Sequence, residues 1–285
     1  MEWIKQIDQS LLLFLNSFHN AFWDKAVTIF TSIEIWIPFY LLIIYYIIKT
    51  YKRNSIYILI IIGLSIAFSD QFANLIKNSV ERLRPTQDPI LGSIVHNVYN
   101  RGGAFGFFSA HAANTFTLAI ISAKLFKNQT YTILIFTWAV LVSFTRIYIG
   151  LHYPGDILTG WVWGFLAGWA FYQLMVRVQK RYFKATYPDI SITSISPEDS
   201  IQLLLFVIIY VATILVTINR LTKFQFFISW TQKYHRIINH LSIPINSNSI
   251  LKRNYLNSFL LDDSFVLSAS FRHIISWTKQ IASWH

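Results

Sequence analysis

Long apolar stretches separated by short polar segments dominate this chain of 285 residues. A helix needs about 20 mostly apolar residues to cross the hydrocarbon core of a bilayer. The strands of a membrane barrel instead alternate apolar and polar residues over about ten positions, and these stretches do not. The pattern predicts an all-α, polytopic transmembrane helix bundle with five to six spans, over residues 29–48, 56–76, 110–126, 131–149, 157–176 and 201–218.

The two ends of the chain depart from this pattern. Residues 1–28 interleave apolar and polar side chains, which is typical of amphipathic helices that lie in the membrane interface. Residues 29–184 contain the first five apolar stretches, and residues 185–218 contain a linker and a candidate extra span. Residues 219–285 form a basic tail for which the pattern predicts no particular structure. If residues 201–218 cross the membrane, this tail lies outside, contrary to the positive-inside rule.

Composition supports a membrane protein and narrows its chemistry. Apolar residues make up 54% of the chain and charged residues only 13%, whereas soluble domains carry about 25% charged residues. The chain has no cysteine, which excludes disulfides, thiolate catalysis and cysteine-based zinc sites. The net charge is +11, but the basic residues lie in short loops between apolar stretches. They therefore indicate contact with membrane lipids and not with nucleic acid.

Loop charge predicts which side of the membrane each loop faces. Loops 77–108 and 150–156 are expected on the outer side, because the loops that alternate with them carry nine basic residues. The positive-inside rule places those nine residues in the cytoplasm. They are Lys49, Lys52, Arg53, Lys124, Lys127, Arg177, Lys180, Arg181 and Lys184.

The first cluster of candidate functional residues lies at the outer end of the second stretch. Lys77 and Arg84 are seven residues apart, so on a continuous helix they share one face two turns apart. Pro85 is then expected to end the helix. The segment predicts two cations at one membrane surface.

The second cluster lies at the start of the third stretch. Gly102, Gly103 and Gly106 precede it, and glycine permits close approach of the backbone. Ser109 is a typical helix N-cap and is followed by His111. The free N–H groups and the positive dipole end of such a helix start form an anion site.

The third cluster joins the fourth and fifth stretches. Arg146 is followed by His152 and Asp156, and Pro154 between them suits the first turn of a helix. Asp156 is then near enough to hydrogen-bond His152 across that turn. Because all three clusters lie on the outer side, the sequence predicts one site that combines cations, a hydroxyl, two histidines and a carboxylate. Such groups can stabilise the charge on a transferring phosphoryl group, attack it and protonate its leaving oxygen.

These clusters resemble the three motifs of the type 2 phosphatidic acid phosphatase family, within the acid phosphatase/vanadium haloperoxidase superfamily. The shared pattern is Lys, six residues, Arg-Pro; then Ser, one residue, His; then Arg, five residues, His, three residues, Asp. The resemblance covers about residues 1–180. Within the family, this part of the chain is similar to small bacterial undecaprenyl-diphosphate phosphatases. It implies that residues 29–184 are a catalytic phosphatase domain in the bacterial inner membrane, with the site facing the periplasm or outside.

The resemblance also implies a role for each motif residue. His152 is the implied nucleophile, which forms a phosphohistidine, and Asp156 orients it. His111 is the implied general acid for the leaving group and later the base for water. The residues implied to bind phosphate are Lys77, Arg84, Ser109 and Arg146.

Two positions depart from the family pattern. The middle motif usually reads Pro-Ser-Gly-His, whereas this chain has Phe108-Ser109-Ala110-His111. The third motif usually begins Ser-Arg, and here Thr145 replaces the serine and keeps its hydroxyl. Ala110 keeps its backbone N–H but lacks the freedom of glycine at positive φ. These changes concern phosphate contacts and leave the catalytic pair in place.

The residues and the resemblance leave several functions open. Undecaprenyl diphosphate is the favoured substrate, with phosphatidic acid, phosphatidylglycerol phosphate and the phosphates of lipid A as close rivals. No metal or other cofactor is implied, and nothing in the sequence indicates an oligomeric state. Vanadate-dependent halide oxidation on the same residues is disfavoured, because those enzymes are typically soluble. A lipid-phosphate binder or transporter without turnover is disfavoured because both histidines are present.

Several polar residues outside these roles need an interpretation. Asp70 and Glu34 lie inside apolar stretches, where ionisable groups usually mark function. Asp70 lies two turns before Lys77 on a similar face, which predicts that it pairs with or tunes that lysine, whereas Glu34 suits a membrane edge. The side chains interpreted as interfacial are Arg82, Arg101, His19 and His96.

Overall fold

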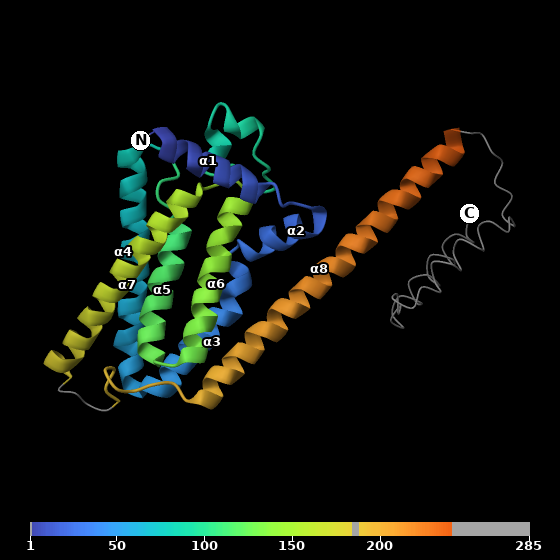
Figure 1. Ribbon diagram of the computed structural model, residues 1–285. Coiled ribbons are helices and arrows are strands. Elements are labelled where there is room, and N and C mark those ends of the chain that lie inside the picture. The colour runs from blue at the N-terminus through green and yellow to red at the C-terminus, as the bar shows by residue number, and fades with distance from the viewer. Residues whose placement is uncertain (1, 184–187, 241–285) are drawn as a thin grey trace, which may run out of the picture. The chain divides into compact units, whose positions relative to one another are not determined.

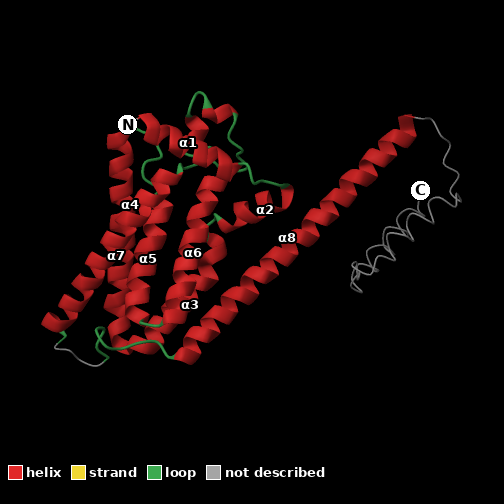
Figure 2. Cartoon of the chain, viewed as in Figure 1, coloured by secondary structure: helices red, strands yellow, loops and turns green. Residues whose placement is uncertain are grey.

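The computed structural model describes residues 2–183 and 188–240, and these ranges fold almost entirely into helices (Figures 1 and 2). Residues 241–285, which hold most of the predicted basic tail, lie outside the described residues. The chain divides into two compact units, and the candidate site and the helices α1 to α7 belong to the first, Met1–Gln225. The α-helices are α1 (Glu2–Asn16), α2 (Ala21–Phe30), α3 (Ile37–Tyr51), α4 (Ser55–Val80), α5 (Ala110–Phe126), α6 (Gln129–Tyr148), α7 (Pro154–Tyr182) and α8 (Pro197–His240).

Length and hydrophobicity identify membrane-spanning helices. Three helical stretches of the described chain are long and apolar enough to cross a membrane: Glu34–Val80, which contains α3 and α4; Gln129–Tyr148, which is α6; and Pro197–Phe226 in α8. Many large apolar side chains on these helices are exposed, as expected where the surrounding solvent is lipid. The described residues contain no strand beyond one isolated bridge between Leu83 and Phe105. The predicted all-α transmembrane class is therefore confirmed.

Helix α5 lies at the centre of the bundle, where α4, α6 and α7 pack around it (Figure 1). Its contact with α7 is very close, because α7 presents Gly160, Gly164 and Gly168 to it, about one per turn on one face. A Cβ on Gly164 would lie 2.5 Å from the Ala113 carbonyl oxygen and 2.7 Å from the Phe116 Cβ. The two helices therefore meet almost backbone to backbone, and this contact fixes the start of α5 beside the start of α7.

The first predicted span begins later than the apolar pattern indicates. The pattern predicts a span over residues 29–48, but α3 begins at Ile37, after the short 3-10 turn η1 (Glu34–Trp36). Pro38 occupies the first turn of α3, where its missing N–H costs no hydrogen bond. Trp36 at this corner is buried, with its ring centroid 5.9 Å from that of Trp138 in α6. Apolarity alone does not distinguish such a buried corner from a continuing helix.

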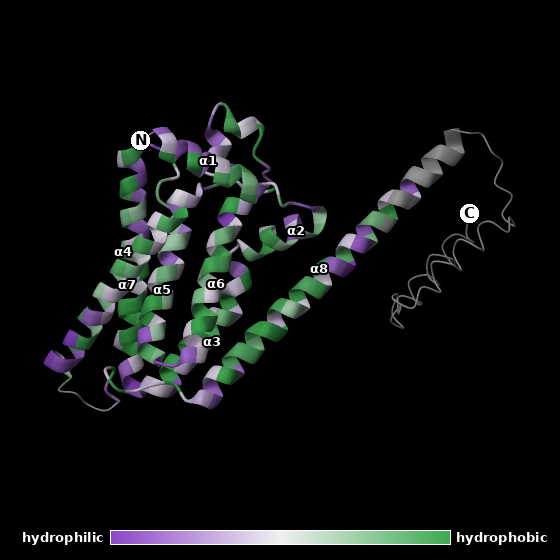
Figure 3. Ribbon diagram, in the orientation of Figure 1, coloured by the Kyte–Doolittle hydropathy of each residue, from purple (hydrophilic) through white to green (hydrophobic). Residues whose placement is uncertain are grey.

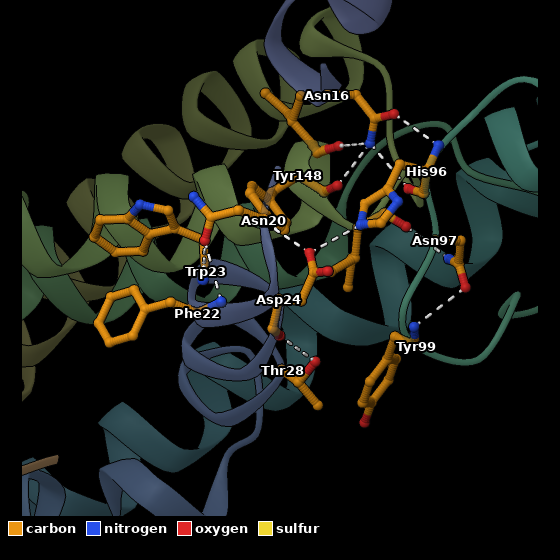
Figure 4. Close-up of polar contacts among 12 residues, drawn as sticks. Asn16, Asn20, Phe22, Trp23, Asp24, Thr28, His96, Asn97, Tyr99 and Tyr148 are labelled. Atoms are coloured by element: carbon orange, nitrogen blue, oxygen red, sulfur yellow. Dashed lines mark hydrogen bonds and ion pairs between the residues drawn. The ribbon is translucent and has the colours of Figure 1, made fainter. Parts of the chain in front are cut away.

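A polar cluster fixes α1 and α2 against the end of α6 (Figure 4). Asn16 in α1 donates its amide to the backbone carbonyls of Tyr148 (2.6 Å) and His96 (3.0 Å). Asp24 in α2 accepts a hydrogen bond from the Tyr148 hydroxyl and contacts Nε2 of His96, each at 2.8 Å. His19 stacks on His96 with ring centroids 3.7 Å apart. These contacts hold both N-terminal helices and the loop after α4 at one end of the bundle, which gives His96 a structural role.

Hydrophilic residues gather at the ends of the bundle helices, most visibly at the C-terminal end of α7 (Figure 3). That end of the bundle also holds the connection from α3 to α4, through η2 (Lys52–Asn54), and the connection from α5 to α6. The opposite end holds the end of α4, the starts of α5 and α7, and the 3-10 turns η3 (Pro85–Gln87) and η4 (Leu91–Ser93). All three predicted functional clusters belong to this second end.

Candidate active site

The chain leaves α4 through a sharp change of direction. Helix α4 ends at Val80, because Glu81 adopts a left-handed conformation with φ 53°. Arg84 is therefore extended, with φ −66° and ψ 154°, and does not share a helix face with Lys77. The prediction of one continuous helix from Lys77 to Arg84 is wrong for this reason. Pro85 does not end α4 and instead begins the short η3 turn.

Arg84 reaches the site because the two ends of the loop between α4 and α5 pair with each other. Arg84 donates its N–H to the Ala104 carbonyl (2.9 Å), and Gly106 donates its N–H to the Arg82 carbonyl (2.8 Å). Gly106 is tightly enclosed, since a Cβ there would lie 3.2 Å from Arg84 Cγ and 3.3 Å from Asp156 Oδ2. This pairing places Arg84 beside the starts of α5 and α7.

The start of α5 carries the second motif. Ser109 is the N-cap, as the sequence predicts, and its hydroxyl accepts a hydrogen bond from the Ala112 N–H at 3.4 Å. Ser109 is fully buried, and its own backbone N–H donates to the Asp156 carbonyl at 3.1 Å. His111 in the first turn is partly exposed, and its ring forms no hydrogen bond with the described part of the chain. The helix start therefore leaves an imidazole and first-turn N–H groups facing the site.

A tight connection between α6 and α7 positions the third motif. Arg146 lies in the last turn of α6, and the backbone N–H of His152 donates to its carbonyl at 3.3 Å. Gly150 between them has φ 69°, a conformation that residues with a Cβ rarely adopt. Helix α7 begins at Pro154, as the sequence predicts. His152 and Asp156 consequently face each other across the start of α7.

Hydrogen bonding defines the protonation state of His152. Its Nε2 lies 2.9 Å from Arg84 Nη1. A guanidinium can only donate, so Nε2 accepts and the ring proton lies on Nδ1, which faces Asp156 Oδ2 at 3.5 Å. Burial, reinforced by the charge of Arg84, holds the pKa of His152 well below its ordinary value, so the ring is neutral. Nε2 therefore presents a lone pair that can attack an electrophile.

Asp156 is fully buried at the centre of a charged network. Its Oδ2 also accepts the Tyr153 N–H at 3.0 Å, and its Oδ1 accepts a hydrogen bond from Arg82 Nη1 at 2.8 Å. Arg82 lies over the Tyr153 ring, 4.0 Å from the centroid, and its Nη2 donates to Asp8 Oδ2 at 2.6 Å. Arg82 thus bridges two carboxylates, a role that differs from the interfacial one suggested by its sequence position.

Sequence reasoning missed three residues that hold the site together: Asp8, Arg82 and Thr31. Besides its contact with Arg82, Asp8 accepts the Gly155 N–H at 2.7 Å. The Thr31 hydroxyl accepts a hydrogen bond from Arg146 Nη1 at 2.9 Å. Arg82 has one local signal, because it lies two residues before an Arg-Pro pair. The partners of Asp8 and Thr31 lie 74 to 147 positions away, so no spacing rule identifies them.

The cations of the three motifs surround both histidines. Each cation acts electrostatically on each imidazole. The Nε atoms of two of the cations, Arg84 and Arg146, are buried without a hydrogen-bonding partner among the described residues, so each retains a donor for an anion. Within the described ranges no group of three or more His, Asp or Glu side chains could hold a metal ion. The residues that the structure brings together are Lys77, Arg84, His111, Arg146, His152 and Asp156.

Comparison with known proteins relates this arrangement to one family. Residues 58–180, which hold all three motifs, match the PAP2 superfamily. A lipid A 4′-phosphatase of Bacteroides thetaiotaomicron is 40% identical over 185 residues, which cover 64% of this chain and 82% of the relative. A lipid A 4′-phosphatase of Porphyromonas gingivalis is 30% identical over 193 residues, covering 66% and 81%. The undecaprenyl-diphosphatase BcrC of Bacillus subtilis is 32% identical over 85 residues, covering 30% and 43%.

Proposed function

The chain belongs to the PAP2 superfamily and is a membrane lipid phosphatase, and from that premise we propose that it removes the 4′-phosphate of lipid A through a phosphohistidine intermediate. The two lipid A 4′-phosphatases align with this chain over 82% and 81% of their length, whereas the undecaprenyl-diphosphatase aligns over 43% of its length. We therefore favour lipid A as the substrate, in place of the undecaprenyl diphosphate that was expected from the motifs.

One observation supports the mechanism above all others: His152 is buried, with Nε2 directed at Arg84 and Nδ1 at Asp156. When a substrate phosphate enters, its oxygens replace Nε2 as the acceptor for Arg84. Nε2 then forms a bond to phosphorus while the bond from phosphorus to the sugar oxygen breaks. Asp156 stabilises the positive charge that develops on the ring, as a carboxylate does in other histidine-based sites.

The second histidine completes both halves of the reaction. His111, in its protonated form, gives a proton to the departing sugar oxygen, which would otherwise leave as a strongly basic alkoxide. It then takes a proton from water, whose oxygen attacks phosphorus as the bond to His152 breaks and inorganic phosphate forms. In both steps the guanidinium and ammonium groups around the site stabilise the charge spread over the three equatorial oxygens. The first-turn N–H groups of α5 add to this stabilisation.

The proposed orientation places the site on the periplasmic side of the bacterial inner membrane. The opposite end of the bundle carries basic residues of three connections, among them Lys49, Lys127 and Arg181. Such residues favour the cytoplasmic side. Tagging of the two ends with accessible cysteines in intact cells tests this orientation directly.

The substrate is tested with the full-length protein, purified in detergent and given lipid A. We expect phosphate release, with mass spectrometry locating the loss at the 4′ position. His152→Ala should lower the rate by about 10⁴-fold or more, because removal of a nucleophile leaves only binding and electrostatic stabilisation. His19 belongs to the polar cluster that fixes α1 and α2 against the end of α6, and His19→Ala should leave the rate unchanged. Loss of the 1-phosphate instead, or faster hydrolysis of undecaprenyl diphosphate, would overturn the substrate, and an active His152→Ala would overturn the nucleophile.

A further inference from the structure

Helix α4 carries a polar face that runs from the site toward the membrane interior. Asp70, Asn74 and Lys77 share this face over two helical turns. A helix of 26 residues such as α4 is about 39 Å long, whereas the hydrocarbon core is about 30 Å thick. Lys77, near the end of α4, therefore lies at the membrane surface, and Asp70 lies about 10 Å deeper. A carboxylate at that depth needs polar partners.

Hydrogen bonds link this face to α5. Lys77 Nζ donates to Asn74 Oδ1 (3.4 Å), and Asn74 Nδ2 donates to Asp70 Oδ2 (3.2 Å). From α5, Asn114 Nδ2 donates to Asp70 Oδ1 (3.2 Å). Asn114 lies one turn after His111, so the network lies beside the histidine proposed to protonate the leaving group. Asp70 and Asn114 are both partly exposed.

This network has more hydrogen-bond acceptors than donors. An ionised Asp70 can only accept, so Asn74 and Asn114 must both direct their NH₂ groups toward it. That orientation leaves Asn114 Oδ1 buried, without a partner among the described residues. The two oxygens of a carboxylate together accept about four hydrogen bonds, and the amides supply two. All the open positions are acceptors, so the missing partner is a hydrogen-bond donor and not a second anion.

Lipid phosphates differ in whether they carry a donor at this depth. A polyprenyl chain begins at the diphosphate and has no donor, and the diacylglycerol of phosphatidic acid offers only ester oxygens. An acylated amino sugar places hydroxyl and amide N–H groups between the phosphate and the acyl chains. Leaving a carboxylate beside hydrocarbon without its full set of hydrogen bonds is costly, so the network favours the third class over the first two.

We propose that Asp70 and Asn114, supported by Asn74, form a specificity subsite that accepts hydrogen bonds from the hydroxyl and amide N–H groups of an acylated amino-sugar phosphate. This inference rests on the proposed function, because it names what distinguishes lipid A from other lipid phosphates at the same phosphate site. The competing role for Asp70 is to position Lys77 through Asn74.

Comparing three substrates on one set of variants distinguishes the two roles of Asp70, binding the amino sugar or positioning Lys77. The full-length protein in detergent is assayed separately with lipid A, undecaprenyl diphosphate and p-nitrophenyl phosphate. The last of these substrates has no lipid part and occupies only the phosphate site. Asp70→Leu and Asn114→Leu should lower kcat/KM for lipid A by about tenfold to a hundredfold, mainly through KM, because a group that bonds the substrate is lost. The other two substrates should be turned over as before. Asp70→Asn keeps the volume but removes the charge and replaces one acceptor oxygen with an NH₂ donor, so it should also lower kcat/KM for lipid A.

The matched control is Gln71→Leu, an exposed neighbour on α4, for which all three substrates should be unaffected. An equal fall on all substrates in Asp70→Leu would show that Asp70 acts through Lys77 and would overturn the subsite. Unchanged kcat/KM for lipid A in both leucine variants would overturn it as well. A wild-type protein that leaves the 4′-phosphate of lipid A in place would overturn the proposed function, and the subsite with it.

Discussion

The half of the site built from the α6–α7 connection is held far more firmly than the half built from α4 and α5. In the first half, His152 is 2% exposed and Asp156 is fully buried, and Arg82 binds the Asp156 carboxylate at 2.8 Å. In the second half, His111 is partly exposed, and its ring forms no hydrogen bond with the described residues. Within the described ranges the side chain of Lys77 forms a single hydrogen bond, which is long at 3.4 Å.

This difference fits two different tasks. A nucleophile must meet phosphorus in line at every turnover, so its position has to be fixed before the substrate arrives. A general acid must reach an oxygen that belongs to the substrate, so its final contact forms only when the substrate is bound. The firmly held half therefore suits attack, and the open half suits entry of the lipid and protonation of its leaving group.

Among the variants that compare the two halves, His111→Ala in the open half has the largest expected effect. His111→Ala should lower the rate on lipid A by roughly 10²- to 10⁴-fold, the usual contribution of a general acid. On p-nitrophenyl phosphate the first step should fall much less, because p-nitrophenolate leaves without a proton. Water attack then lacks its base, so the phosphohistidine should accumulate. Stopped-flow absorbance should show a burst of p-nitrophenolate in this variant.

Two results would contradict this assignment of His111. One is an equal fall in the rate of the first step, phosphoryl transfer to His152, on both substrates, which places His111 in phosphate binding. The other is a variant that releases p-nitrophenolate slowly from the first turnover, without a burst. Asn74→Ala is a useful companion, since it alters the open half near Lys77 while leaving both histidines in place.

A smaller effect tests the firmly held half. Asp8→Asn removes one charge from the chain of contacts Asp8–Arg82–Asp156 without touching the phosphate site. A charge-assisted hydrogen bond contributes about 1.5–3 kcal/mol, so kcat should fall by about tenfold or more. KM should change little, because Asp8 contacts Arg82 and the Gly155 N–H and would act on the nucleophile through Asp156. Steady-state kinetics on lipid A measure both constants.

Glu2→Gln is the matched control, because it also neutralises one carboxylate on α1 and Glu2 is exposed. It should leave kcat unchanged. If Asp8→Asn raised KM and left kcat unchanged, Asp8 would belong to substrate binding at the membrane surface, and the idea that α1 supports the nucleophile would be wrong.

The helices of this fold could be predicted because apolar length specifies them. The stretch predicted over residues 110–126 coincides with α5, and Pro154 begins α7 as its ring geometry suggests. The corner at Trp36 could not be predicted, because a buried turn has the same apolar residues as a helix. Nor could the end of α4, which depends on the left-handed conformation of Glu81, a residue with no special preference for it.

The motif residues of the site could be identified because each motif is local. His152 and Asp156, for example, are four residues apart and meet across one helical turn. The supports could not be identified in this way: Asp8 and Arg82 are 74 positions apart, and only the docking of α1 brings them together. Long-range ion pairs of this kind leave no periodic signal in a single sequence.

The smallest expected effect tests the contact that joins the two halves. Gly164→Ala places a Cβ 2.5 Å from the Ala113 carbonyl oxygen, so α5 and α7 must move apart; overpacking of this kind costs about 1–3 kcal/mol. For a chain of this size that lowers the unfolding temperature by roughly 2–10 °C. Gly63→Ala on α4 is the control, because its Cβ meets nothing within 4 Å, and alanine in a helix should raise stability slightly. Tryptophan fluorescence during heating in detergent compares the two variants, and equal unfolding temperatures would show that α5 and α7 are not locked together at Gly164.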